Sequence, residues 1–174
     1  MADQLAEAAR RIRELEDLDA VSSVILGFET MRDGRPETAD NLLKFVMPDI
    51  RFYWSLEDIE LKGSQELIAY LQEGMTPRIW CRHAVANIQV KVKGDRAEAT
   101  WYVMAESVSR PDPKRAGKGD KRARQREPAS LDTLIHSDTK GAKHATLVRT
   151  ADGWKFSDYQ TDMARISVSH VKVG

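Results

Sequence analysis

One stretch constrains the fold of this chain more than any other, namely residues 86–108, ANIQVKVKGDRAEATWYVMAESV. Apolar and polar residues alternate on both sides of Gly94-Asp95, and this pattern predicts a two-stranded antiparallel hairpin with a tight turn. A two-residue turn pairs Lys91 with Glu98, and their opposite charges support this register. The chain must therefore build a sheet around this hairpin.

A second hairpin and several helices complete the expected fold. The second hairpin covers residues 143–168 around Asp152-Gly153. Helical spacing of apolar residues predicts a polar helical arm at residues 3–16 and, after a break in phase near Asp17, a packed helix that ends near Gly34. The other expected elements are a helix that begins at Pro36 and ends at Pro48, a strand at 49–54, and a helix with Ser64 as N-cap and Gly74 as stop. Helices followed by long strands favour an α+β protein, with the helices on one face of a curved antiparallel sheet.

The length, the charge balance and the cysteine count limit the class of protein. A chain of 174 residues has the usual size of one domain, so we expect a single domain at 1–174. Twenty-seven basic residues balance 27 acidic ones, which predicts no nucleic-acid or membrane partner. The single cysteine excludes an internal disulfide framework. The chain has neither a membrane-length apolar run nor the apolar core of a signal peptide, so we expect a cytoplasmic protein.

The segment between the hairpins, residues 110–139, has a different composition. It is rich in proline, glycine and basic residues and shows no apolar periodicity until Leu131. We expect a mobile basic insertion loop. A solvated loop, a lid over a site and a nucleic-acid-binding arm are all open, although the arm lacks aromatic residues that could stack on bases.

His83 lies in the expected first strand, in the stretch CRHAVANIQV. Strict alternation places it opposite Glu106, on the face away from the apolar residues. A bulge near residues 84–86 would turn it to the apolar face and shift its partner by one residue. Both placements are open, and so are a structural role and a role as general acid or base.

Five stretches together resemble the SnoaL-like proteins of the nuclear-transport-factor-2-like superfamily: DAVSSVILGFETMRDG, MPDIRFYW, GSQELIAYL, RHAVANIQVKVKGDRAEATWYV and GAKHATLVRTADGWKF. The resemblance implies a cone-shaped curved antiparallel sheet wrapped around a long helix, with two further helices and a small, mostly apolar substrate in the mouth. The superfamily includes cofactor-free lyases and isomerases as well as proteins without catalysis, so the fold does not fix the function.

The layout is most similar to the bile-acid dehydratase branch, and this similarity implies an acid/base dyad of Asp33 and His83. Phe28 stands where that branch has a tyrosine. An aspartate is unfavourable at the carboxyl end of a helix, which also favours a functional role for Asp33. In such a dyad the carboxylate orients one imidazole nitrogen and the other nitrogen moves a proton. We expect a direct contact with Asp33 to raise the pKa of His83.

Aromatic and polar side chains on or near the expected strands are the candidates for substrate binding. Together they suit a cavity for an aromatic or polycyclic ligand, although each alone could be a core residue. The candidates are Phe28, Tyr53, Trp80, Trp101, Tyr102, Glu106, His144 and Tyr159. The four histidines show no metal-ligand spacing and the chain has no glycine-rich phosphate loop, so we expect no metal and no cofactor.

The resemblance, together with these residues, implies two classes of function. The first is a cofactor-independent lyase or isomerase that takes a proton from a small aromatic or polycyclic hydroxylated substrate and eliminates water or a small fragment. The alternative is a non-catalytic protein, either the small (beta) subunit of a ring-hydroxylating dioxygenase or a small-ligand-binding protein. Because residues 3–16 have only a thin apolar stripe, we also expect a homodimer or homotrimer.

Overall fold

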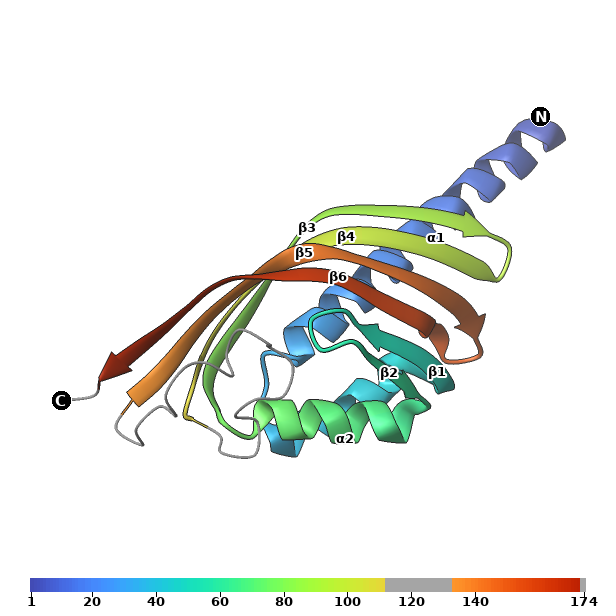
Figure 1. Cartoon of the computed structure of the whole chain (residues 1–174). Helices are drawn as coiled ribbons and strands as arrows, with labels where there is room; N and C mark the ends of the chain where they lie inside the picture. Colours follow the sequence, from blue (N-terminus) through green and yellow to red (C-terminus); the bar gives the residue numbers. More distant parts are fainter. Residues whose placement is uncertain (112–132, 173–174) are drawn as a thin grey trace.

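The structure, a computed structural model, describes residues 1–111 and 133–172. The described residues form α1 (Ala2–Met31), the 3-10 helix η1 (Pro36–Phe45), α2 (Ser64–Met75) and the strands β1 (Val46–Trp54), β2 (Ile59–Lys62), β3 (Arg78–Lys93), β4 (Arg96–Ser109), β5 (Thr133–Thr150) and β6 (Gly153–Lys172). The strands make one sheet in the order β2-β1-β6-β5-β4-β3. This sheet is strongly curved and arches over α2 and the end of α1 (Figure 1). The predicted α+β class is confirmed.

The sheet is mixed, whereas the sequence predicted a wholly antiparallel one. Strand β1 pairs antiparallel with β2 but parallel with β6. Strands that are not joined by a hairpin are free to run parallel, and β1 and β6 lie at opposite ends of the sheet-forming part of the chain. The pairing of β1 with β6 shifts register between Val46 and Arg51. Pro48 lies at this irregularity, where a strand tolerates a residue without an N–H, instead of ending a helix as expected.

The hairpin of β3 and β4 has the predicted turn, with Lys91 opposite Glu98. Its register shifts by one residue between Ala86 and Gln89, and Asn87 there has a positive φ of 55°. Asparagine tolerates this conformation better than most residues. The shift is a bulge of the kind left open by the sequence, and it lies just beyond the expected residues 84–86.

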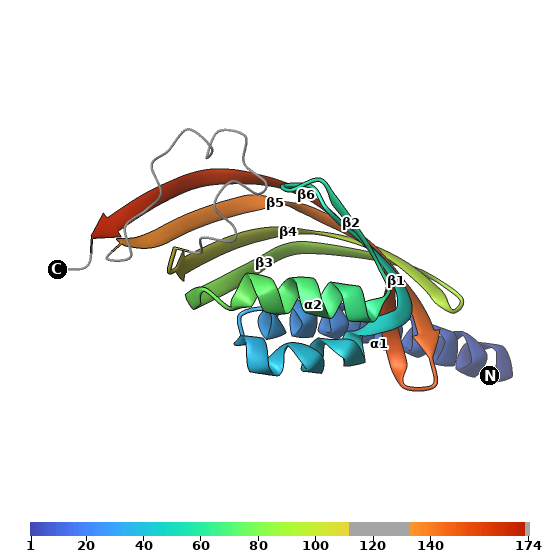
Figure 2. The ribbon, with the colours of Figure 1, turned by 60° about the horizontal axis from the view of Figure 1, so that its bottom comes forward.

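The helices cover the concave face of the sheet (Figure 2). In α1, Val21, Ile25 and Phe28 recur at helical spacing and are fully buried. The Phe28 ring meets two rings of β6, with centroids 5.2 Å from Phe156 and 5.3 Å from Tyr159. These contacts fix the second half of α1 against the middle of the sheet.

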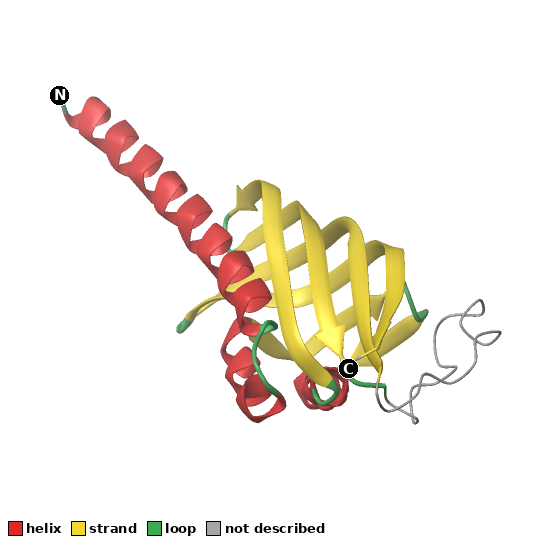
Figure 3. Cartoon of the chain, turned by 90° about the vertical axis from the view of Figure 1, so that its left-hand side faces the viewer, coloured by secondary structure: helices red, strands yellow, loops and turns green. Residues whose placement is uncertain are grey.

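The first half of α1 extends beyond the sheet (Figure 3), in one continuous helix without the expected break near Asp17. Asp17 accepts a 2.6 Å hydrogen bond from Arg149, whose guanidinium also donates to Asp95 and lies 4.5 Å from the Trp154 ring centroid. Arg149 therefore joins both hairpin turns to α1. Leu5 and other apolar residues of the projecting half are exposed, and assembly into a homodimer or homotrimer stays a prediction.

Other boundaries differ from those predicted. Helix α2 begins after Gly63, whose φ of 88° favours glycine, and it continues through Gly74. Residues 133–139 belong to β5, so the expected loop at 110–139 is shorter; residues 112–132 lie outside the described part. Among the described helices, none is both long and apolar enough to cross a membrane.

Gly141 of β5 is a point of close approach between strands. A Cβ there would lie 2.1 Å from the carbonyl oxygen of Asp162 on β6. We therefore predict that Gly141→Ala lowers the free energy of unfolding by about 1–3 kcal/mol, because backbone must shift. Urea denaturation measures this, and the neighbouring exposed Lys140→Ala should change stability by less than about 0.5 kcal/mol. Equal stability of the two variants would contradict this packing.

Candidate active site

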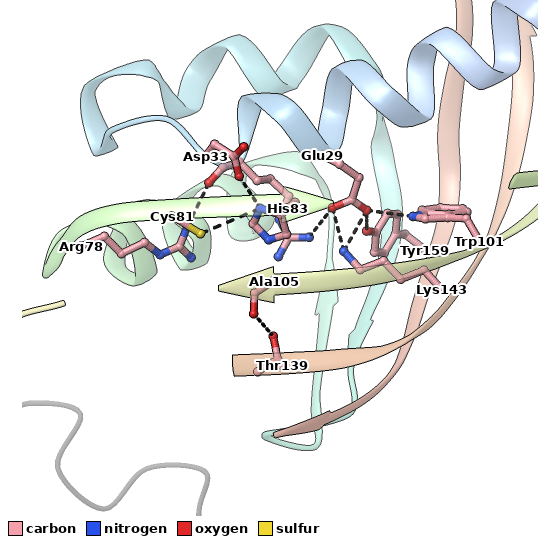
Figure 4. A network of polar contacts seen from close by, with 11 residues as sticks. Glu29, Asp33, Arg78, Cys81, His83, Trp101, Ala105, Thr139, Lys143 and Tyr159 are labelled. Atoms are coloured by element: carbon pink, nitrogen blue, oxygen red, sulfur yellow. Dashed lines mark hydrogen bonds and ion pairs between the residues drawn. The ribbon is translucent and has the colours of Figure 1, made fainter. Parts of the chain in front are cut away.

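The end of α1 and the beginning of β3 bring Asp33 and His83 together (Figure 4). The Nδ1 atom of His83 lies 2.6 Å from Oδ1 of Asp33, and the side chains are 5% and 14% exposed. Asp33 follows the helix in a turn where its N–H donates to the carbonyl of Thr30. His83 faces inward and lies opposite Ala105, not Glu106, because the bulge at Asn87 reverses the alternation.

This contact sets what the imidazole can do. In neutral His83 the Nδ1–H donates to the Asp33 carboxylate, which leaves a lone pair on Nε2. A nitrogen in this state can accept a proton, and the carboxylate stabilises the imidazolium that forms. The pair therefore has the geometry of an acid/base dyad.

The pKa of His83 moves opposite to our expectation. Burial, aided by the nearby positive charge of Arg32, lowers this pKa to about 4, although the hydrogen bond to Asp33 acts in the opposite direction. The expectation that Asp33 would dominate was wrong because it left out both the depth of burial and Arg32. His83 is consequently neutral at pH 7.

A buried carboxylate, Glu29, lies one helical turn before Asp33, and sequence reasoning missed it. Its Oε1 accepts hydrogen bonds from Trp101 Nε1 (3.1 Å), the Tyr159 hydroxyl (2.6 Å) and Lys143 Nζ (2.8 Å). Its Oε2 accepts from Lys143 (2.8 Å) and Arg32 (3.0 Å). This network connects α1 to β4, β5 and β6 (Figure 4).

Charges dominate this network. Burial by itself raises the pKa of Glu29, but Lys143 and Arg32 outweigh it and hold the pKa well below its ordinary value. Burial, together with the charge of Arg32, lowers the pKa of Lys143 to about 7, although Glu29 opposes this. A sequence signal exists, since Glu29 and Lys143 occupy inward positions in otherwise apolar patterns.

Three of the candidates for substrate binding lie on the concave side, near or within the buried network. Trp101 and Tyr159 donate hydrogen bonds to Glu29, and Phe28 packs against Tyr159. All three are buried, with relative exposures of 1% or less. The structure therefore places them in the core, where they pack around the buried network.

The other five candidates do not lie with the dyad. Tyr102 is 56% exposed, since the inward positions of β4 are taken by Trp101 and Val103. Exposed Glu106 on the same outer face contacts Nε2 of His136 at 2.7 Å. His144 is exposed between inward-facing neighbours for the same reason.

Tyr53 and Trp80 are also directed away from the dyad. The Tyr53 hydroxyl donates to Asp58 at 3.0 Å, and its side chain is 37% exposed. Trp80 is 41% exposed, because the adjacent Cys81 takes the inward position of β3. The face of Trp80 could not be assigned from the sequence without the bulge at Asn87.

Two groups of potential metal ligands occur in the described residues. The first group is Asp33, Cys81 and His83, and the second is Glu106, His136 and Asp138. Within each group, the possible ligand atoms lie within 4.8 Å of one another. The Cys81 sulfur lies 3.9 Å from Nδ1 of His83, and burial raises the pKa of its thiol. The expectation of no bound metal stays a prediction.

The Glu29–Lys143 pair offers a test of the network. We predict that Lys143→Met lowers the free energy of unfolding by about 3–5 kcal/mol, because it removes one cation from a buried carboxylate. The double variant Glu29→Gln/Lys143→Met should cost less than the sum of the single changes. Chemical denaturation measures the cycle, with Lys140→Met on the same strand as an exposed control. Additive costs would show that the two side chains stabilise the fold independently.

Comparison with solved structures shows the fold. A proposed aromatic ring hydroxylase from Novosphingobium aromaticivorans has a TM-score of 0.69 and 18% identity, over 90% of this chain and 94% of that one. A proposed scytalone dehydratase from the same organism has a TM-score of 0.64 and 15% identity, over 92% and 91%. A hexachlorocyclohexane dehydrochlorinase (LinA) type 2 has a TM-score of 0.63 and 13% identity, over 92% and 93%.

Sequence comparison identifies the family. No curated protein matches the chain. The family model of the SnoaL-like domain matches residues 13–160, which is most of the chain and includes both Asp33 and His83. The resemblance seen in the sequence is thereby confirmed, and the chain belongs to the SnoaL-like domain family.

Proposed function

We propose that this protein is a cofactor-independent lyase or isomerase that uses Asp33 and His83 as its acid/base dyad. The observation that carries the proposal is the 2.6 Å contact between a buried imidazole and a carboxylate. The substrate is a small aromatic or polycyclic hydroxylated compound, since members of this family commonly bind small apolar ligands.

The reaction follows from the roles of the two nitrogens. The Nε2 atom of His83 takes a proton from a carbon of the substrate, and the electrons of that C–H bond form a double bond. The C–O bond to a hydroxyl group breaks, and the hydroxyl leaves as water after it receives the proton from Nε2. Asp33 orients the ring and stabilises the imidazolium between these steps. In an isomerase the proton returns to another carbon instead.

Similar structures support elimination more than the alternative. A dehydrochlorinase and a proposed dehydratase are both named for eliminations, although at 13% and 15% identity they share only the fold with this chain. A third similar structure is named a proposed aromatic ring hydroxylase, and it also shares only the fold with this chain. The alternative function is a non-catalytic small subunit of a ring-hydroxylating dioxygenase. Such a subunit has no need of an acid/base dyad, whereas the proposed elimination uses one to move the proton.

The dyad can be tested with 5-nitrobenzisoxazole, whose ring opens when a positioned base removes its proton. We predict that His83→Ala and Asp33→Asn each lower kcat by about 10²–10⁴-fold, the range for loss of positioned acid–base catalysis. His144→Ala on the outer face is the matched control and should keep the full rate. Circular dichroism verifies that the variants are folded. Full activity of folded His83→Ala would disprove the proposal.

The pH dependence of the same reaction tests the state of the base. The neutral imidazole is the active form, and its pKa is lowered to about 4 in the folded protein. We therefore predict that kcat/KM stays level from pH 7 down to about pH 5 and falls as the pH passes through about 4. A fall centred near the ordinary histidine value of about 6.5 would show that His83 is not held in this environment.

A further inference from the structure

Arg32 carries a hydrogen-bond donor that the network does not use. Its side chain is buried, with 3% relative exposure, and one terminal nitrogen donates to Glu29 at 3.0 Å. The Nε atom has no hydrogen-bond partner among the described residues. An unsatisfied buried donor on a charged group is costly, so proteins retain one where a ligand or water completes it.

The position of Arg32 links this donor to the dyad. Arg32 immediately precedes Asp33, and its carbonyl oxygen accepts a 3.0 Å hydrogen bond from Arg78 at the beginning of β3. Its guanidinium carbon lies 5.8 Å from the ring centroid of Trp54, which provides an apolar wall. The charge of Arg32 also acts directly on the imidazole of His83.

The surrounding charges allow an anion to approach. The carboxylates of buried Glu29 and partly buried Asp33 face two buried basic side chains, Arg32 and Lys143. These basic side chains offset most of the negative charge that would repel a ligand. A positively charged hydrogen-bond donor in a site that excludes water is a strong partner for an oxyanion.

We propose that the Nε–H of Arg32 binds an anionic oxygen of the substrate, which defines the substrate as an aromatic compound that carries a carboxylate or forms an oxyanion when it loses its proton. This inference rests on the proposed function, because Arg32 immediately precedes Asp33 of the dyad and its charge acts on the imidazole of His83. A carboxylate on the substrate and an oxyanion that forms in the reaction both present an anionic oxygen to the donor. The experiment distinguishes these two sources.

The first part of the experiment measures binding of 2-naphthoate and 2-naphthamide, which have the same ring system and differ in charge. Near neutral pH, wild-type protein should bind the naphthoate at least about tenfold more tightly, as expected for a charge-assisted hydrogen bond. In ¹⁵N NMR, the Nε–H signal of Arg32 should shift on addition of naphthoate. Arg32→Lys keeps a cation for Glu29 but has no Nε–H, and it should lose most of the preference.

The second part measures the ring opening of 5-nitrobenzisoxazole, in which a phenolate forms from a neutral substrate. A fall in kcat of Arg32→Lys with unchanged preference for naphthoate assigns the donor to the oxyanion that forms in the reaction. Loss of the naphthoate preference assigns it to a carboxylate carried by the substrate. The control is Arg35→Lys, an exposed arginine three residues away, which should change neither quantity.

Two outcomes would overturn the inference. One is equal affinity of wild-type protein for the two probes together with an unchanged kcat of Arg32→Lys. The other is an Arg32 signal that stays unmoved both at saturating naphthoate and at saturating 2-cyano-4-nitrophenolate, the product of ring opening. The NMR measurement uses the wild type, so it decides even where Arg32→Lys does not fold. His83→Ala should abolish ring opening but keep the naphthoate preference, so failure of the dyad and failure of the Arg32 donor are distinguishable.

Discussion

The shared carboxylate of Glu29 is the interaction on which the site depends. Its two oxygens accept five hydrogen bonds from Arg32, directly after α1, and from side chains on β4, β5 and β6. A buried carboxylate is stable only when its partners keep this geometry. If α1 rotated or slid against the sheet, Glu29 would lose several of these hydrogen bonds. Asp33 lies four residues further along the same chain. The register of the helix therefore sets where the carboxylate of the dyad points.

His83 reaches the carboxylate of Asp33 because β3 contains one extra residue. Without the bulge at Asn87, the alternation that places Val90 and Val92 inward would direct His83 to the outer face, opposite Glu106. The left-handed conformation of Asn87 absorbs the extra residue and turns His83 and Cys81 inward. Two local features, the charged anchor on α1 and the bulge on β3, thus place side chains 50 positions apart at hydrogen-bond distance.

The sequence predicts what depends on local pattern and misses what depends on three-dimensional context. The turn at Gly94-Asp95 and the register of Lys91 with Glu98 follow from alternation and charge, and both are confirmed. The faces of Tyr102 and His144 follow from the same alternation, but ligand-binding roles were assigned by residue type instead. The inward positions of Glu29 and Lys143 can be seen in the sequence pattern, but their pairing cannot, since the partners of Glu29 come from three strands and the end of α1. Likewise, the lowered pKa of His83 depends on burial and on Arg32, which only the folded chain brings near.

The low pKa of His83 poses a problem for catalysis that the same network can solve. A base with a pKa of about 4 is always ready to accept a proton at neutral pH, but it accepts one only weakly. In the proposed mechanism, an oxyanion at the Nε–H of Arg32 places a negative charge near the cation that disfavours imidazolium. With a substrate that carries a carboxylate, that charge offsets the effect of Arg32, so the basicity of His83 rises once the substrate is bound. Protonation is then coupled to occupancy: the empty site keeps a neutral histidine, and the occupied site holds a stronger base at the carbon that loses its proton.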